Sequence, residues 1–172
     1  SNGFTLGVGQ RSNEDGGSYV SWTFRKAAKF FDVVTYTGDG ATGKVVTHNL
    51  GATPGMVIIK RTDSTSDWAV YHRSLNGGVG PEDYRLFLNT TAAATAGPSY
   101  IFASVSSTSF TLGSNGAGAG STLTNVNGAT YVAYLFAHDT SADGIIQTGS
   151  FTTDVAGDAA ISLGWEAQYV LY

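Results

Sequence analysis

The chain contains the same strand-loop-strand pattern twice, and this internal repeat constrains its fold more than any other feature. The first copy begins with FTLG at Phe4 and ends with GSYVSWTF at Phe24. The second begins with FTLG at Phe110 and ends with ATYVAYLF at Phe136. The matched ends enclose polar loops of different length, as expected for two strands joined by a surface loop. The repeat indicates a fold built from similar supersecondary units.

A second echo extends the repeat. The letters LG at Leu50 and the apolar run 56–59 recur as LG at Leu163 and the run 169–172. The two echoes place copies of strands on both sides of a central unit. We therefore predict three parts, which are the closing strands of one unit in 1–28, one complete β-sandwich unit in 29–140, and the opening strands of a further unit in 141–172.

The spacing of apolar and turn-forming residues predicts an all-β chain. Runs rich in β-branched and aromatic residues recur every ~8–12 residues, and no stretch has a convincing helical period. This spacing is typical of an antiparallel β-sandwich or barrel. A Thr-Gly-Asp-Gly turn beginning at Thr37 predicts a hairpin between two of the strands. The predicted strands are 4–6, 19–24, 30–36, 43–47, 56–59, 68–72, 84–88, 100–103, 109–112, 130–137 and 169–172.

One face of the repeated strand is predicted to form the core, because it stays bulky and apolar in both copies. Every second residue of a strand lies on the same face. The continuous run 56–59 predicts a strand buried on both faces. The segment 113–127, in contrast, is predicted to be a surface loop that tolerates deletion. The predicted core residues are Val132, Tyr134, Phe136, Leu50, Val57 and Ile59, with Val20, Trp22 and Phe24 as their equivalents in the first copy of the repeated strand.

Composition excludes several classes of function. A net charge of −4 with only 13% charged residues leaves no basic surface for nucleic acid. The absence of Cys rules out disulfides and thiolate metal sites. No apolar run is long enough to insert in a membrane as a helix. The low charge and the abundance of Gly, Thr, Ser and Ala are common in extracellular all-β proteins, and we expect an extracellular location.

One cluster predicts a ligand or partner surface. Trp68, Tyr71 and His72 lie on the predicted strand 68–72, and Arg73 follows it directly. Strand alternation continued to Arg73 places Trp68 and His72 on one face and Tyr71 and Arg73 on the other. An aromatic ring of this cluster would stack on a sugar, and Arg73 would bind an anionic group. The alternative interpretation is a core strand whose polar end reaches solvent.

Catalytic motifs are absent from the sequence, and we predict that the chain is not an enzyme. The Gly-rich segment 116–120 precedes no helix and has no Lys, so it lacks the features of a phosphate-binding loop. His48 corresponds to Ile161 in the second echo, which favours a structural role. The adjacent carboxylates Glu82 and Asp83 are typical of a solvated loop, whereas a glycosidase needs two carboxylates on opposite sides of the scissile bond.

We predict no cofactor and no metal site, with Ca²⁺ as the alternative. Pairs of Asp residues four positions apart recur in predicted turns, and carboxylate oxygens are the ligands that Ca²⁺ prefers. The EF-hand pattern is absent, and Asp is also an ordinary turn residue. The pairs are Asp63 with Asp67, Asp139 with Asp143, and Asp154 with Asp158.

Three segments together resemble a known family. They read VVTYTGDGATGKVVTHNLGATPGMVIIKRTDSTSDWAVYH, LFLNTTAAATAG, and FTLGSNGAG followed by NGATYVAYLF. They are similar to the tandem β-sandwich repeats of tailed-bacteriophage virion proteins, particularly tail-fibre and adhesion proteins. The resemblance implies a lectin-like, jelly-roll sandwich in a structural or host-attachment protein without enzymatic activity, located at the virion surface or tail. It carries over no functional residues.

Three functions follow as competing hypotheses. The first is an extracellular structural or adhesive module of a phage tail fibre that assembles with copies of itself, as a trimeric fibre or a head-to-tail filament, and contacts a host glycan. The second is a structural protein of a bacterial surface filament built from the same sandwich. The third is the carbohydrate-binding module of a carbohydrate-active enzyme. Strands donated between chains would favour assembly, and an aromatic groove would favour sugar binding.

Overall fold

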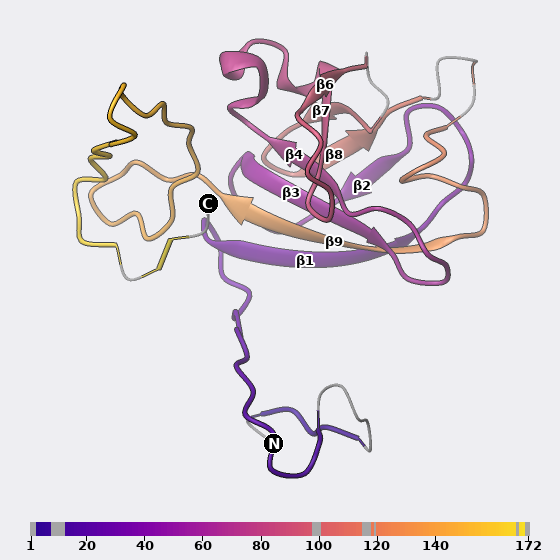
Figure 1. The fold of residues 1–172 in the computed structure, drawn as a ribbon. Helices are drawn as coiled ribbons and strands as arrows, with labels where there is room; N and C mark the ends of the chain where they lie inside the picture. Colours follow the sequence, from indigo (N-terminus) through magenta and orange to yellow (C-terminus); the bar gives the residue numbers. More distant parts are fainter. Residues whose placement is uncertain are drawn as a thin grey trace.

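The regular secondary structure of the chain is almost entirely β-strand. The computed structural model describes residues 3–7, 13–97, 101–114, 118, 120–167 and 169–170. No helix in this part of the chain is long and apolar enough to cross a membrane. Two short 3-10 helices span Leu75–Gly78 and Pro81–Asp83. The strands are β1 Phe31–Thr37, β2 Val45–Thr47, β3 Pro54–Arg61, β4 Ala69–His72, β5 Tyr84–Phe87, β6 Thr95–Ala96, β7 Phe102–Val105, β8 Ser109–Leu112 and β9 Thr130–Ala137 (Figure 1).

The strands form two antiparallel sheets that pack as a β-sandwich, which confirms the predicted fold class. The large sheet has the order β1-β9-β3-β4-β5-β6, and the small sheet has the order β2-β8-β7. In the large sheet β9 lies between β1 and β3. Phe136 of β9 is opposite Phe31 of β1, and Leu135 of β9 is opposite Val57 of β3. Both sheets therefore depend on contacts between residues far apart in the sequence.

The predicted hairpin at Thr37 is wrong. β1 and β2 follow each other in sequence but belong to different sheets, because β1 pairs with β9 and β2 pairs with β8. Gly38 explains the crossing. A Cβ atom at this position would lie 2.1 Å from the carbonyl oxygen of Val126, so only glycine allows the chain to pass this close to the loop before β9.

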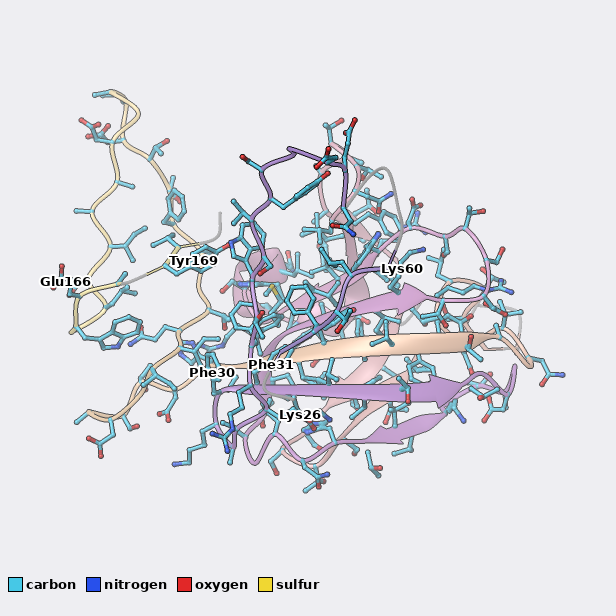
Figure 2. All side chains as sticks on the ribbon, turned by 90° about the horizontal axis from the view of Figure 1, so that it is seen from below. Lys26, Phe30, Phe31, Lys60, Glu166 and Tyr169 are labelled. Atoms are coloured by element: carbon cyan, nitrogen blue, oxygen red, sulfur yellow. The ribbon has the colours of Figure 1, made fainter. Side chains whose placement is uncertain are left out.

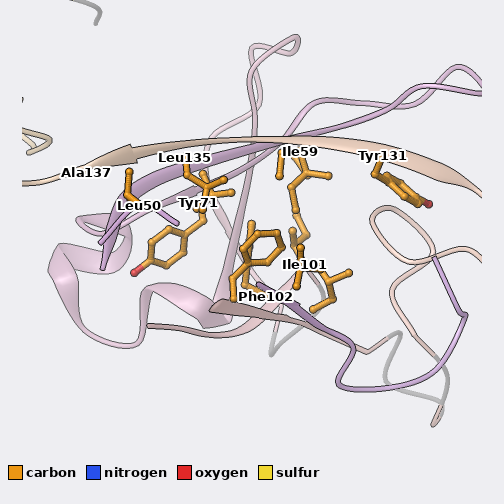
Figure 3. Packing of buried hydrophobic residues seen from close by; sticks show 14 of the residues in the cluster. Leu50, Ile59, Tyr71, Ile101, Phe102, Tyr131, Leu135 and Ala137 are labelled. Atoms are coloured by element: carbon orange, nitrogen blue, oxygen red, sulfur yellow. The ribbon is translucent and has the colours of Figure 1, made fainter. Parts of the chain in front are cut away.

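The hydrophobic core lies between the inner faces of the two sheets (Figure 3). Tyr71 of the large sheet contacts Phe102 of the small sheet with ring centroids 5.5 Å apart, and Phe102 contacts Phe110 at 5.8 Å. Full burial of side chains of this size stabilises a fold by about 1.5–3 kcal/mol each. The predicted core residues Leu50, Val57 and Ile59 are buried here, at 0%, 0% and 1% exposure.

The predicted core face of β9 is wrong. Tyr131, Ala133 and Leu135 are buried at 1%, 0% and 0% exposure, whereas the predicted Val132, Tyr134 and Phe136 lie half-buried on the outer face. The outer face is apolar because neighbouring strands also place apolar residues there. Because both faces of β9 are apolar, the sequence pattern does not show which face points into the core.

Strand β3 has the double burial that its continuous apolar run predicts. Val57 and Ile59 face the core, and Ile58 on the outer face is also buried, at 8% exposure. Ile58 lies opposite Tyr134 of β9 and Val70 of β4, which cover it from both sides. A central strand in a sheet with two apolar faces therefore accounts for the run.

The segment 113–127 is not the tolerant surface loop that we predicted. Ser121, Thr124 and Asn125 are buried at 2%, 0% and 0% exposure, and the hydroxyl of Tyr36 donates to the carbonyl oxygen of Thr124 at 2.8 Å. The second half of the segment thus closes one end of the sandwich. Residues 115–117 and 119 lie outside the described part of the chain.

The predicted strands on either side of the sandwich are not formed. Residues 4–6 and 19–24 have no strand conformation, and Val20 and Trp22 are 87% and 69% exposed. On the C-terminal side, residues 138–167 and 169–170 contain no strand either. The last predicted strand also includes residues 171–172, which lie outside the described residues.

Candidate functional site

The structure divides the predicted site cluster between the two faces of the large sheet. Tyr71 points into the core and is 4% exposed. Burial raises the pKa of its hydroxyl to about 12, with a further contribution from the charge of Glu82. Trp68 and His72 lie on the outer face, and Arg73 follows the end of β4 as an exposed residue. Because Tyr71 is buried in the core, it is not exposed on one surface together with Trp68, His72 and Arg73.

Trp68 belongs instead to an aromatic platform on the outer face, which we define as Trp68, Tyr134 and Lys60. The rings of Trp68 and Tyr134 are stacked, with centroids 6.5 Å apart and planes at 17°. The ammonium group of Lys60 lies 5.9 Å from the Trp68 ring centroid, within the range of a cation–π contact. Register explains the grouping, since Ile58 opposite Tyr134 and Ile59 opposite Ala69 bring the three residues to adjacent strands.

Hydrogen bonds from polar side chains hold the residues next to the platform in place. The amide nitrogen of Asn89 donates to Asp67 at 2.9 Å, while its oxygen accepts a hydrogen bond from the Trp68 backbone N–H at 2.9 Å. Lys60 donates to the carbonyl oxygen of Ser66 at 2.7 Å. These bonds fix the turn that precedes β4, so the indole ring has a defined position. Flat rings with polar groups at their rim are suited to stack on the apolar face of a sugar.

His72 lies beside a second histidine at the end of the large sheet. Nδ1 of His72 accepts from the backbone N–H of Ser74 at 3.2 Å, and Nδ1 of His138 accepts from that of Thr148 at 3.1 Å. Burial and then the charge of Arg73 lower the pKa of both imidazoles. Both rings are therefore neutral near pH 7 and act as hydrogen-bond acceptors for the backbone.

His48 has the structural role that its sequence position predicts. Its side chain is 5% exposed, and both ring nitrogens are used. Nδ1 accepts from the backbone N–H of Leu50 at 3.2 Å, so the proton of the neutral ring is on Nε2, which donates to the carbonyl oxygen of Ser106 at 3.2 Å. The ring thus links two backbone segments.

The carboxylates singled out in the sequence take part in local turns and pairs. Asp63 pairs with Arg61 at 2.7 Å, Asp139 accepts from the Ser141 N–H, and Asp154 accepts from the N–H groups of Ala156 and Asp158. Glu82 and Asp83 lie in the second 3-10 helix. Within the described residues no three His, Asp or Glu side chains come close enough together to hold a metal ion.

A shallow hollow opens on the outer face near the end of β1. Its lining consists mainly of threonine, with no charged side chain. The lining residues are Thr35, Tyr36, Thr37, Thr62, Thr130 and Tyr131. None of these six lining residues carries a carboxylate, an ammonium, an imidazole or a thiol group.

Asp32 is a buried carboxylate that the sequence analysis missed. It is 4% exposed and accepts hydrogen bonds from the backbone N–H groups of Asn49, at 2.8 Å, and Val33, at 2.9 Å. Lys26 forms an ion pair with it at 3.0 Å. Burial alone would raise the pKa of Asp32, but these hydrogen bonds and the Lys26 charge outweigh it and hold the pKa below its ordinary value.

The Lys26 contact anchors the root of the N-terminal arm, which we define as residues 13–24. Figure 2 shows Lys26, Phe30 and Phe31 together where the chain enters β1. The ring of Phe24 contacts Phe31 at 5.4 Å and Phe136 at 6.0 Å. Beyond this aromatic contact the arm runs away from the sandwich (Figure 1), and its only described ring contact is between Trp22 and Tyr169, at 5.8 Å.

Comparison with known proteins adds one finding. A family model described as "Domain of unknown function (DUF7483)" matches residues 1–172. No curated protein and no solved structure matches the chain.

Proposed function

We propose that this chain, which belongs to the DUF7483 family of domains of unknown function, is a structural and adhesive module that assembles with copies of itself. In this proposal the module is part of a bacteriophage tail fibre or a similar virion appendage and is located outside the cell, at the virion surface. It is not an enzyme. The resemblance of three segments to phage virion repeats supports the context, and the structure supports the mode of action as follows.

The exposed apolar side chains of the N-terminal arm carry the proposal. Val20 is 87% exposed, Trp22 69% and Phe24 43%. Apolar residues that alternate along an extended segment are typical of a strand that is paired on one side and buried on one face. The described residues provide neither a partner strand nor a covering sheet for this arm. A neighbouring copy would supply both.

The C-terminal side of the chain supports the same conclusion. Tyr169 and Val170, which echo the start of the apolar run in β3, are 53% and 61% exposed. Among the described residues, the ring contact between the two flanking segments is Trp22 with Tyr169. In the repeat, Trp22 corresponds to Tyr134 and Tyr169 corresponds to Met56. Their counterparts lie on the same face of adjacent strands β9 and β3 in the sandwich. We propose that both segments are strands of incomplete jelly-roll-like repeat units.

Self-assembly of this kind is heterologous, because a surface on one side of the chain meets a different surface on the other side. A heterologous contact produces a ring or an open filament. Either a trimeric fibre or a head-to-tail filament satisfies the geometry, and a bacterial surface filament would use the same contacts. The virion assignment rests on the resemblance alone.

The test is the mass of the chain in solution. The intact chain is expected to assemble as its concentration rises in sedimentation velocity runs, and a chain lacking residues 1–25 is expected to remain monomeric with an intact sandwich. A matched variant, Trp22→Ser, should weaken assembly. Leu88→Ser, which changes an exposed apolar residue just after β5, should not. An intact chain that stays monomeric at all concentrations would contradict the proposal.

The aromatic platform favours glycan contact as a second function of the same module, or as the main one if the chain is a carbohydrate-binding module. Trp68 and Tyr134 present stacked rings on the outer face, with Lys60 beside them. Titration of tryptophan fluorescence with host-surface glycans tests this. Trp68→Ala should abolish a response that Trp22→Ala retains, and the absence of any response across a broad glycan panel would rule against it.

A further inference from the structure

β1 is an edge strand with half of its backbone groups directed away from the sheet. The carbonyl oxygen of Phe30 accepts from the N–H of Ala137 at 2.9 Å, and the N–H of Gly38 donates to the carbonyl oxygen of Ala129 at 2.8 Å. Hydrogen-bonded positions recur at every second residue of an antiparallel ladder. The even-numbered residues of β1 therefore bond to β9. Phe31, Val33, Thr35 and Thr37 direct their N–H and C=O groups to the open edge.

The chain's own N-terminal side occupies only the first part of this edge. Ala27 and Phe31 exchange two backbone hydrogen bonds, at 3.0 and 3.1 Å, and Lys26 donates to the carbonyl oxygen of Val33. The arm then turns away, because Phe24 packs on the outer-face rings of Phe31 and Phe136. The edge groups of Thr35 and Thr37 are left without a partner among the described residues.

The backbone of the arm also lacks hydrogen-bond partners. Residues 18–24 make no backbone hydrogen bond to any residue that the structure describes. In strand conformation this segment would place Val20 and Trp22 on one side and Tyr19, Ser21 and Thr23 on the other. An unpaired edge and an unpaired alternating segment are the two halves of a strand-addition contact.

We propose that the arm of one copy adds to the open edge of β1 in a second copy, antiparallel, with Thr23 opposite Thr35 and Ser21 opposite Thr37. The inference rests on the proposed self-assembly and names the surface that accepts the arm. In this register Thr23 and Thr35 exchange two backbone hydrogen bonds, as do Ser21 and Thr37. Trp22 then lies beside Tyr36 on the inner side of the sheet.

The chemistry of the side chains selects this register. Tyr36 stands at the open side of the sandwich, stacked on Tyr131 with centroids 5.0 Å apart and in contact with Phe110 at 6.3 Å. The Trp22 ring would extend this aromatic row, while Thr23 and Ser21 would face solvent beside threonines. A slip by one residue would move Trp22 to the outer side and bring Ser21 and Thr23 inward.

The chain's own arm does not take this place, because the Phe24 ring would have to leave Phe31 and Phe136 and cross to the inner side next to Val34. The ring cluster at the arm's root directs residues 18–23 away from their own β1 (Figure 1). The arm is therefore presented to another molecule, and the partner is a second copy of this chain.

Disulfide trapping tests the register, since the chain has no cysteine of its own. Thr23→Cys and Thr35→Cys chains are mixed in equal amounts under mild oxidation and analysed on non-reducing gels with mass identification. Residues in a hydrogen-bonded antiparallel pair have Cα atoms about 5.5 Å apart, which suits a disulfide. A heterodimeric disulfide is expected to form faster than in a control mixture of Thr23→Cys and Thr53→Cys. Thr53 is also exposed, but it does not lie on the β1 edge.

A backbone variant gives a second measurement. Thr35→Pro removes an N–H that points to the open edge and leaves the ladder between β1 and β9 intact. It is expected to lose assembly in sedimentation while keeping the circular dichroism of the intact chain. If Thr35→Pro fails to fold, the disulfide result alone decides.

The outcomes separate this inference from the proposed function. Assembly of the intact chain without a preferred Thr23–Thr35 disulfide would overturn the β1 edge as acceptor and leave self-assembly standing. A preferred disulfide between Ser21→Cys and Thr35→Cys would overturn the register. A Thr23→Cys/Thr35→Cys double variant that closes only within one chain would overturn the second copy as partner. A chain that never assembles would overturn both proposals.

Discussion

The Nδ2 atom of Asn125 donates hydrogen bonds to Oδ1 of Asp39, at 2.9 Å, and to the carbonyl oxygen of Ala41, at 2.8 Å. Its Oδ1 atom accepts from the backbone N–H of Asp39 at 3.0 Å, so one fully buried side chain satisfies three groups of a distant turn. Asn125 thereby ties the segment before β9 to the crossing between β1 and β2. These hydrogen bonds fix the second half of the Gly-rich segment 113–127 against the sandwich.

Asn125→Ala is expected to destabilise the chain by about 1–3 kcal/mol, because it leaves backbone groups of the turn without partners. Urea unfolding followed by circular dichroism measures the change. Asn127→Ala is the matched control, since Asn127 is exposed in the same segment. Equal stability of the two variants would show that the Asn125 bonds are dispensable.

Leu135→Ala is expected to cost about 2–5 kcal/mol, because it opens a cavity between the sheets. Phe136→Ala should cost less, since its ring is half-buried on the outer face against Phe31, at 5.1 Å. Leu88→Ala, at an exposed position, serves as the baseline. Thermal and urea unfolding compare the three. A larger loss for Phe136→Ala than for Leu135→Ala would reverse the assignment of the faces of β9.

Asp32→Asn is expected to weaken the acid dependence of stability. A carboxyl whose pKa is lowered in the folded state stabilises the fold above its unfolded pKa of about 3.9, and this stabilisation is lost as the pH falls through the folded pKa. The wild-type chain should therefore lose stability below about pH 4 more steeply than Asp32→Asn. Asp143→Asn, which removes an exposed carboxylate that forms no ion pair with any described residue, should behave like the wild type. An unchanged slope in Asp32→Asn would contradict the buried ion pair.

Stability is also expected to fall as the pH drops from 7 to 5. Burial lowers the pKa of His48, with the Ser106 hydrogen bond and the Asp32 charge opposing it. The unfolded chain then binds a proton at about pH 6.5 that the folded chain does not, so the free energy of unfolding decreases as the pH falls through this value. His72 and His138 contribute in the same direction.

His48→Gln should reduce this pH dependence and leave the contributions of the other two histidines. Urea midpoints at pH 7.5 and pH 5 measure it, with the wild type run in parallel. A wild-type chain as stable at pH 5 as at pH 7.5 would mean that the three imidazoles titrate alike in the folded and unfolded states.

The amino-acid sequence by itself determined the class of fold and the places of most strands. Short runs rich in β-branched and aromatic residues, separated by turn residues, predict sheets and leave no stretch with the period of an α-helix. The apolar run 56–59 was enough to predict a strand buried on both faces. These features are local, because strand conformation and turn chemistry depend on residues next to each other in the chain.

Only the tertiary structure decided which strands pair and which faces form the core. Thr37 begins a hairpin signal, yet β1 pairs with β9 and leaves β2 to the other sheet. Alternation along β9 is the same whether Leu135 or Phe136 points inward, since both faces are apolar. Tyr71 and Trp68 lie close in sequence but on opposite faces of one sheet. In each case the deciding contacts are made by residues far apart in the chain, and no local pattern contains that information.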